Sequence, residues 1–149
     1  MKTKEQYTYV SAGILIFWMF LIFVLSSQSG LSSGGNPPLS FYVERKGAHV
    51  FEYFVLALLS FRFFRDVYAR PARNDSQAER SDSGGESAKR VMFLAAAFAL
   101  AYAATDEFHQ LFVPGREGKM TDVLIDGGGV ALFICTYIVW MRYQHKISK

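Results

Sequence analysis

The sequence has one cysteine, Cys135, so no internal disulfide can form, and we interpret this residue as a small buried hydrophobic side chain. No small-residue cleavage site of the Ala-x-Ala kind follows the first apolar segment, which favours a retained membrane anchor over a secretory signal peptide. The sequence also lacks internal repeats and a nucleotide-binding glycine loop. A disulfide-stabilised domain and a phosphate-loop fold are therefore excluded.

Hydrophobic residues make up 51% of the chain and fall into four runs that are separated by polar segments. Each run approaches the roughly 20 residues that a helix needs to cross a bilayer. The sequence therefore predicts an all-α integral membrane bundle. Its four transmembrane helices are expected at about 9–25, 46–64, 91–111 and 122–141.

The lysines and arginines predict the orientation of this bundle. Both termini and the middle segment together carry twelve of them, whereas the two other connections carry four: Arg45, Lys46, Arg116 and Lys119. By the positive-inside rule, both termini and the middle segment are cytoplasmic. This anchoring accounts for the net positive charge, so no nucleic-acid partner is expected.

The middle segment, residues 66–89, is rich in Ser, Asp, Glu and Arg and has few large apolar side chains. Such a composition cannot bury enough surface to fold. We expect a flexible cytoplasmic linker rather than a binding element.

Ionisable side chains gather at the outward ends of three predicted helices, where charge at membrane depth is unfavourable and usually functional. Steps of three or four residues place them on common helix faces. In the second helix these residues are Lys46, His49, Glu52 and Tyr53. In the third they are Tyr102, Asp106 and His109 or Gln110, with Glu107 pointing elsewhere and Pro114-Gly115 ending the helix.

The fourth helix is expected to begin at Thr121 or Asp122. The Asp122 side chain can cap exposed backbone amides, and an acid in the first turn complements the positive end of the helix dipole. A structural role therefore explains Asp122. Asp126 lies one turn deeper, beside Gly127-Gly128-Gly129, where another backbone can approach closely. Asp126 is therefore the stronger functional candidate.

We take His49, Asp106, His109 and Asp126 as candidate catalytic residues. The candidate substrate-binding residues are Lys46, Glu52, Glu107, Gln110, Arg116 and Asp122. The alternative is that all these groups pair with one another and only hold the bundle together. Neither a metal nor a cofactor can be assigned from the sequence, because Glu107 and His109 do not share a helix face as the histidines of a His-Glu-x-x-His site do.

Three sequence blocks resemble the VanZ-like family, and with Ser26-Ser27-Gln28-Ser29 they cover all four predicted helices. The first block is Arg45-Lys46-x-x-His49-x-x-Glu52-Tyr53, and the last is Asp122-Val123-x-x-Asp126. Between them, Thr105-Asp106-Glu107-Phe108-His109-Gln110 leads to Pro114-Gly115-Arg116. The glycine run at 127–129 and the middle segment depart from the family pattern.

The resemblance implies a multi-pass protein of the bacterial cell membrane with a link to resistance against the glycopeptide teicoplanin. A phosphotransbutyrylase activity, the label of some relatives, does not fit an outward-facing site, because acyl-CoA is cytosolic.

Two functions are compatible with the residues, besides the expected contact with the lipid bilayer. The site binds a cell-envelope component such as a cell-wall precursor, a polyprenyl-linked lipid or a glycopeptide. Alternatively it is an outer-leaflet enzyme for a lipid-linked or cell-wall precursor, in which a histidine is the acid or base and Arg116 holds a phosphate. Transport through the bundle is disfavoured, because few polar groups lie deeper in the membrane.

Overall fold

The computed structural model describes residues 4–28, 39–68, 83–116 and 118–147. It contains four long helices: α1 (Lys4–Ser26), α2 (Leu39–Tyr68), α3 (Ser83–Gln110) and α4 (Met120–Ile147). All four are long and apolar enough to cross a membrane. The prediction of an all-helical protein with four membrane-spanning helices is confirmed.

The helices are longer than the apolar runs that predicted them. α2, α3 and α4 have 30, 28 and 28 residues. At 1.5 Å per residue such helices reach about 42 to 45 Å, well beyond a hydrocarbon core of about 30 Å. Of the predicted linker 66–89, residues 66–68 and 83–89 are helical, and residues 69–82 lie outside the described part of the chain.

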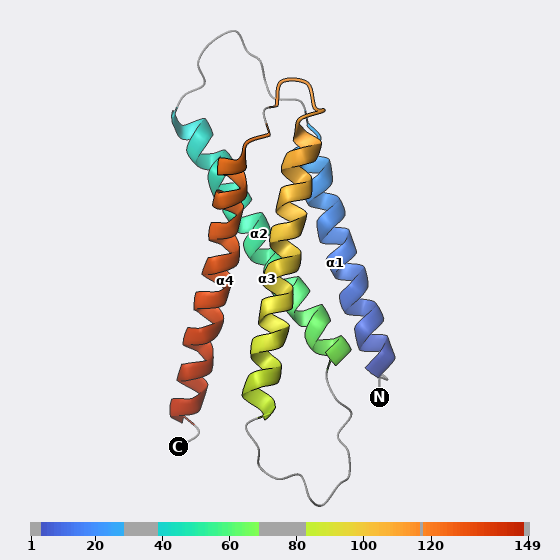
Figure 1. Cartoon of the computed structure of the whole chain (residues 1–149), viewed down its shortest axis with the longest axis vertical. Helices are drawn as coiled ribbons and strands as arrows, with labels where there is room; N and C mark the ends of the chain where they lie inside the picture. The colour runs from blue at the N-terminus through green and yellow to red at the C-terminus, as the bar shows by residue number, and fades with distance from the viewer. Residues whose placement is uncertain (1–3, 29–38, 69–82, 117, 148–149) are drawn as a thin grey trace, which may run out of the picture.

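Both termini lie at one end of the bundle, which we call the lower end (Figure 1). The opposite, upper end is formed by the last turns of α1 and α3 and the first turns of α2 and α4. α2 crosses the bundle diagonally and packs against all three other helices. The ionisable segments singled out in the sequence therefore meet at the upper end.

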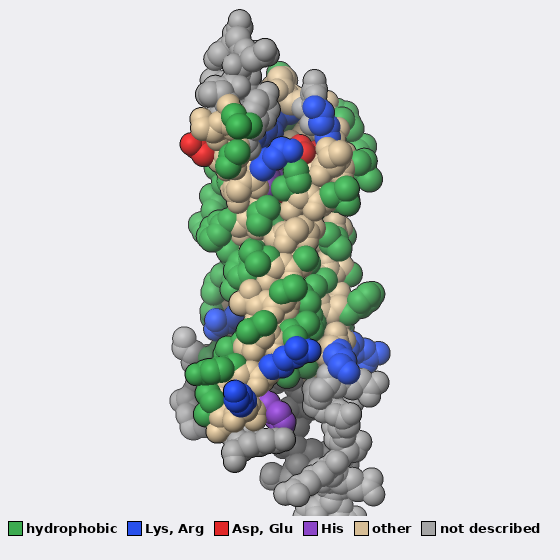
Figure 2. Space-filling model, turned by 90° about the vertical axis from the view of Figure 1, so that its left-hand side faces the viewer, with side chains coloured by type: hydrophobic (Ala, Val, Ile, Leu, Met, Phe, Trp, Pro, Cys, Tyr) green, Lys and Arg blue, Asp and Glu red, His purple; other side chains and the backbone are tan. Residues whose placement is uncertain are grey.

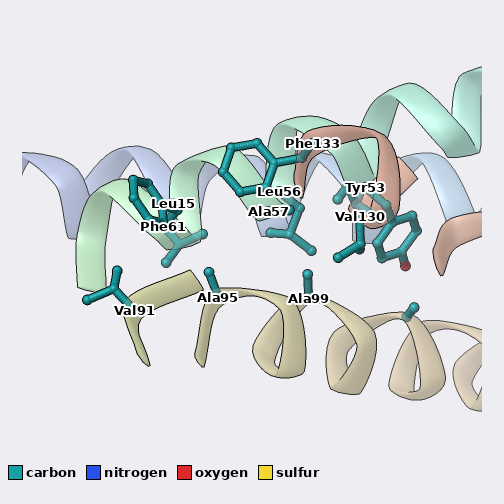
Figure 3. Close-up of a cluster of buried hydrophobic side chains, with 12 residues drawn as sticks. Leu15, Tyr53, Leu56, Ala57, Phe61, Val91, Ala95, Ala99, Val130 and Phe133 are labelled. Atoms are coloured by element: carbon teal, nitrogen blue, oxygen red, sulfur yellow. The ribbon is translucent and has the colours of Figure 1, made fainter. Parts of the chain in front are cut away.

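A row of small residues allows α3 to approach α2 closely. Val91, Ala95, Ala99 and Ala103 follow one another at steps of four and are all buried. They face the buried side chains of α2, among them Tyr53, in the apolar cluster shown in Figure 3. Small side chains at such spacing are typical of membrane helix interfaces, because they bring backbones together.

Two aromatic side chains attach α1 to its neighbours through backbone carbonyls. The Trp18 indole N–H donates to the Glu52 carbonyl at 3.0 Å, and the Tyr102 hydroxyl donates to the Met19 carbonyl at 2.7 Å. In a bilayer these donors have no water to bond, so such contacts fix the position of α1.

The outer surface carries apolar side chains between the two ends (Figure 2). Cys135 is exposed on this surface of α4, so its expected burial is wrong. A lipid-facing position is as apolar as a protein core, and composition alone does not distinguish the two. Lys and Arg side chains lie near both ends in Figure 2. The described basic residues in the lower parts of α2, α3 and α4 are Arg62, Arg65, Lys89, Arg90, Arg142 and Lys146.

Candidate functional site

Asp106, in the last turn but one of α3, is buried at the upper end and is held from two sides. The Ser26 hydroxyl at the end of α1 donates to Asp106 Oδ1 at 2.6 Å. The Gln110 side-chain amide donates to Asp106 Oδ2 at 3.1 Å. Because both carboxyl oxygens have a donor, Asp106 is a well-satisfied buried group.

Glu107 is also buried, which contradicts the expectation that it points away from the other polar groups. Its Oε1 accepts a second hydrogen bond from Gln110 at 3.1 Å, and its Oε2 accepts one from the Lys119 backbone N–H at 2.9 Å. Glu107 follows Ala103 by four residues and so continues the packing face of α3. That spacing is the sequence signal that would have placed it inward.

The connection between α3 and α4 folds back tightly onto this end of α3. Gly115 has a φ of 75°, a backbone conformation that favours glycine. At Gly118 a Cβ would collide with the Glu107 carbonyl oxygen and would lie 2.9 Å from the Leu111 side chain. The two glycines thus allow the loop to bring the Lys119 N–H to Glu107.

His49 of α2 and Asp126 of α4 are joined across the helix interface. His49 Nδ1 and Asp126 Oδ1 are 3.1 Å apart, and Asp126 is fully buried. The two helices come this close because Gly129 lies directly against the α2 backbone at Val50. The inference that the glycine run admits another backbone thus holds at Gly129.

The donor atoms of His49, Glu107 and Asp126 lie within 4.8 Å of one another. We call these three residues the His-Glu-Asp cluster. Through Glu107 and Gln110 the cluster is linked to Asp106, and through Asp106 to Ser26. The resulting polar network connects all four helices at the upper end.

Two further side chains of α2 surround this network. Glu52 is half-buried and lies within electrostatic range of His49, Asp106 and Asp126. Tyr53 is fully buried, and its ring extends from α2 toward α3 in Figure 3. Tyr53 is a neighbour of the site that was not among the candidates, although its spacing of four from His49 places it on the same face.

His109 is not part of the cluster. Its Nε2 lies 3.1 Å from the Ser27 hydroxyl, and its ring packs against Phe23 with the centroids 4.7 Å apart. It therefore connects the ends of α3 and α1. A catalytic role shared with His49 is not supported by this position.

Arg116 binds the open end of α1. Its Nε donates to the Gln28 carbonyl at 2.9 Å and its NH2 group donates to the Leu25 carbonyl at 3.1 Å. Burial, followed by the nearby charge of Arg45, lowers the pKa of Arg116. Because a guanidinium stays protonated in proteins, Arg116 remains a cation at the negative end of the α1 dipole. This role competes with the expected clamp on a phosphate.

Lys46 and Asp122 lie outside the cluster. Asp122 is half-buried in the first turn of α4, which begins two residues earlier than Asp122, at Met120. Lys46 is exposed and, among the described residues, is the one charged side chain that lines a groove of about 700 Å³. The groove runs along the outside of α2 and α4, and its lining residues are Leu39, Val43, Lys46, Gly47, Val50 and Ile125.

Comparison with known proteins agrees with this arrangement. The sequence model of the VanZ/LLP1 family matches residues 12–141, which extend from within α1 to within α4 and include the polar network. The chain belongs to the VanZ/LLP1 family. No curated protein and no solved structure gave a significant match. In this VanZ-like protein the polar network must therefore be interpreted from its own geometry.

Proposed function

We propose that this VanZ-like protein lies in a bacterial cell membrane with its lower end in the cytoplasm and its upper end facing outward. More of the described basic residues lie at the lower end than at the upper end, which supports this orientation, because Lys and Arg are retained on the cytoplasmic side. The upper end, with the His-Glu-Asp cluster, then faces the cell envelope.

We further propose that the upper end binds a lipid-linked cell-wall precursor carried on a polyprenyl phosphate. The groove between α2 and α4 supports this more than any other observation. Its walls are apolar, its volume of about 700 Å³ lies within the range of ligand pockets, and Lys46 supplies a cation near the membrane surface. A prenyl chain fits such walls, and a phosphate is attracted to the lysine.

The polar network lies beside this groove. Two residues that line the groove are sequence neighbours of the cluster. Val50 directly follows His49, and Ile125 directly precedes Asp126. A head group held near Lys46 is therefore close to buried carboxylates and an imidazole, which bind sugar hydroxyls and amines well. By holding the precursor, the protein contributes to teicoplanin resistance, which the family resemblance implies.

Photo-crosslinking of the purified protein with a photoactivatable polyprenyl phosphate tests this binding. Val43→Trp fills the groove, and Val139→Trp makes the same change at an exposed position of α4 away from it. We expect crosslinking to fall several-fold in Val43→Trp and in Lys46→Ala but not in Val139→Trp. Equal crosslinking of all three variants would contradict the proposal.

A second candidate function is an outer-leaflet enzyme that acts on the same class of precursor. The hydrogen bond between His49 and Asp126 favours it, since a carboxylate that orients an imidazole is common in general acid–base catalysis. An enzyme changes the envelope lipids, whereas a binding protein does not. If cells lacking the protein show altered teicoplanin susceptibility but an unchanged lipid profile, turnover is ruled out.

A further inference from the structure

The His-Glu-Asp cluster combines the donor atoms of a metal site with several buried or half-buried acids. Glu52, Asp106, Glu107 and Asp126 meet at this end of the bundle. Among the described residues, no lysine or arginine forms a salt bridge with any of the four, and His49 is the only ion-pair partner. Arg116 acts on Glu52, Asp106 and Glu107 only from a longer distance. Carboxylates at this depth need neutralisation by protons or by a cation.

Two buried polar atoms of the described residues lack hydrogen-bond partners at this place. Asp126 Oδ2 is one, although Oδ1 of the same carboxylate contacts His49. The Tyr53 hydroxyl is the other, and it lies within electrostatic range of Asp106 and Asp126. Native proteins rarely leave such atoms unsatisfied, and an ion or water bound beside them is a common reason.

The geometry also suits a metal ion. Ligands at about 2.0 to 2.2 Å from a tetrahedral metal place their donor atoms about 3.4 Å apart. The His49–Asp126 distance of 3.1 Å is slightly shorter than this separation, and the whole cluster lies within 4.8 Å. Drawing the three donor atoms together from separations of at most 4.8 Å would complete a three-ligand site that leaves a position open for another molecule.

The surroundings of Glu107 resemble the outer shell of known metal sites. Gln110 and the Lys119 N–H each donate to one of its carboxyl oxygens, and each oxygen keeps a lone pair for a metal. Such hydrogen bonds orient a ligating carboxylate.

We propose that His49, Glu107 and Asp126 bind a divalent first-row transition-metal ion of the Zn²⁺ or Mn²⁺ kind. An imidazole nitrogen favours these ions over Mg²⁺ and Ca²⁺, and the two carboxylates neutralise the charge. Metal binding displaces the proton shared by His49 and Asp126, so both become ligands. The site does not rest on the proposed precursor binding and would stand without it.

Metal analysis of the purified full-length protein tests this site directly. After treatment with a chelator, the protein in detergent is dialysed against Zn²⁺ or Mn²⁺, and bound metal is measured by mass spectrometry. We expect about one ion per chain for one of these metals in the wild type. Asp126→Asn or Glu107→Gln should each weaken metal binding at least about tenfold. Loss of a residue that only hydrogen-bonds to a metal ligand already has an effect of that size, and loss of the ligand itself should have a larger one.

Glu44→Gln is the matched control, because Glu44 is an exposed acid of α2 that lies outside the cluster. Thermal unfolding with and without metal gives a second readout, and metal should raise the melting temperature of the wild type and of Glu44→Gln only. Failure of the folded wild type to retain either metal would overturn the proposal. Retention of equal metal by Asp126→Asn and Glu107→Gln would do the same, because the ion would then lie elsewhere.

Discussion

At the scale of single residues, the buried acids of the upper end differ in how completely they are satisfied. Asp106 receives donors from Ser26 and Gln110, whereas Asp126 has one oxygen with no partner among the described residues. A buried acceptor that loses its donor is destabilising, because no water replaces it. Asp106 is therefore suited to holding helices together, and Asp126 is better placed to bind something else.

Ser26→Ala should destabilise the protein by about 1 to 2 kcal/mol, because it removes one of the two donors to buried Asp106. Thermal or denaturant unfolding in detergent measures the change. Thr136→Ala is the control, since this exposed hydroxyl donates only to the Leu132 carbonyl one turn earlier in α4. Equal stability of the two variants would mean that Asp106 does not depend on Ser26.

Helical spacing was enough to predict some of these positions. It placed His49 and Asp126 toward the bundle, because each belongs to a stripe of polar residues at steps of three or four. It misplaced Glu107, because the burial of this residue depends on how α3 is rotated against its neighbours. It placed His109 correctly on the face of Tyr102 and Asp106, which contacts α1. The buried residues Ala95, Ala99 and Ala103 set the rotation of α3. The spacing of the ionisable residues alone does not show this packing face.

At the scale of helices, the contact between α2 and α4 decides whether His49 and Asp126 meet. Gly129 lies against the α2 backbone, and a Cβ there would be 2.9 Å from the Phe54 nitrogen and would collide with the Val50 carbonyl oxygen. Backbone atoms cannot move aside as a flexible side chain can. Any side chain at Gly129 must therefore push the two helices apart.

Gly129→Ala should lower stability by about 1 to 3 kcal/mol, as overpacking does, and should separate His49 from Asp126. Gly128→Ala is a matched control, because a Cβ at Gly128 meets nothing within 4 Å. Alanine favours helix over glycine by about 1 kcal/mol, so the control should be neutral or slightly stabilising. Unfolding measurements compare the two, and a larger loss in Gly128→Ala would refute this packing.

The existence of the four helices followed from the apolar runs, but their ends did not. α2 continues from the predicted Phe64 to Tyr68, and α4 continues from Met141 to Ile147. Hydropathy detects the part of a helix that crosses hydrocarbon, whereas helical hydrogen bonding continues into the polar region beyond it. The predicted ranges are therefore shorter than the helices that the structure contains.

At the scale of the whole molecule, charge is divided between the two ends. The lower end carries more basic residues, from α2, α3 and α4. The upper end carries the buried acids with His49 and fewer cations, namely Arg45, Lys46, Arg116 and Lys119. This division supports an orientation with the polar network outward. The orientation decides which substrates the site can meet, since polyprenyl-linked precursors reach the outer leaflet and acyl-CoA does not.

Labelling of single cysteines tests this orientation in a Cys135→Ser background. Phe112→Cys lies in the exposed connection at the upper end, and Lys89→Cys lies at an exposed position of α3 near the lower end. A membrane-impermeant maleimide should label Phe112→Cys in intact cells and Lys89→Cys only after permeabilisation. The reverse pattern would place the polar network on the cytoplasmic side.

The central claim is that the polar network is a working site and does more than stabilise the bundle. The most direct test measures membrane abundance and teicoplanin susceptibility together, in cells whose only copy of the protein carries Asp126→Asn. We predict normal abundance with the susceptibility of cells that lack the protein, whereas Glu44→Gln should behave as the wild type. The claim would be contradicted if cells with Asp126→Asn had normal abundance of the protein and wild-type susceptibility. It would also be contradicted if Asp126→Asn, His49→Gln and Glu107→Gln were all lost from the membrane.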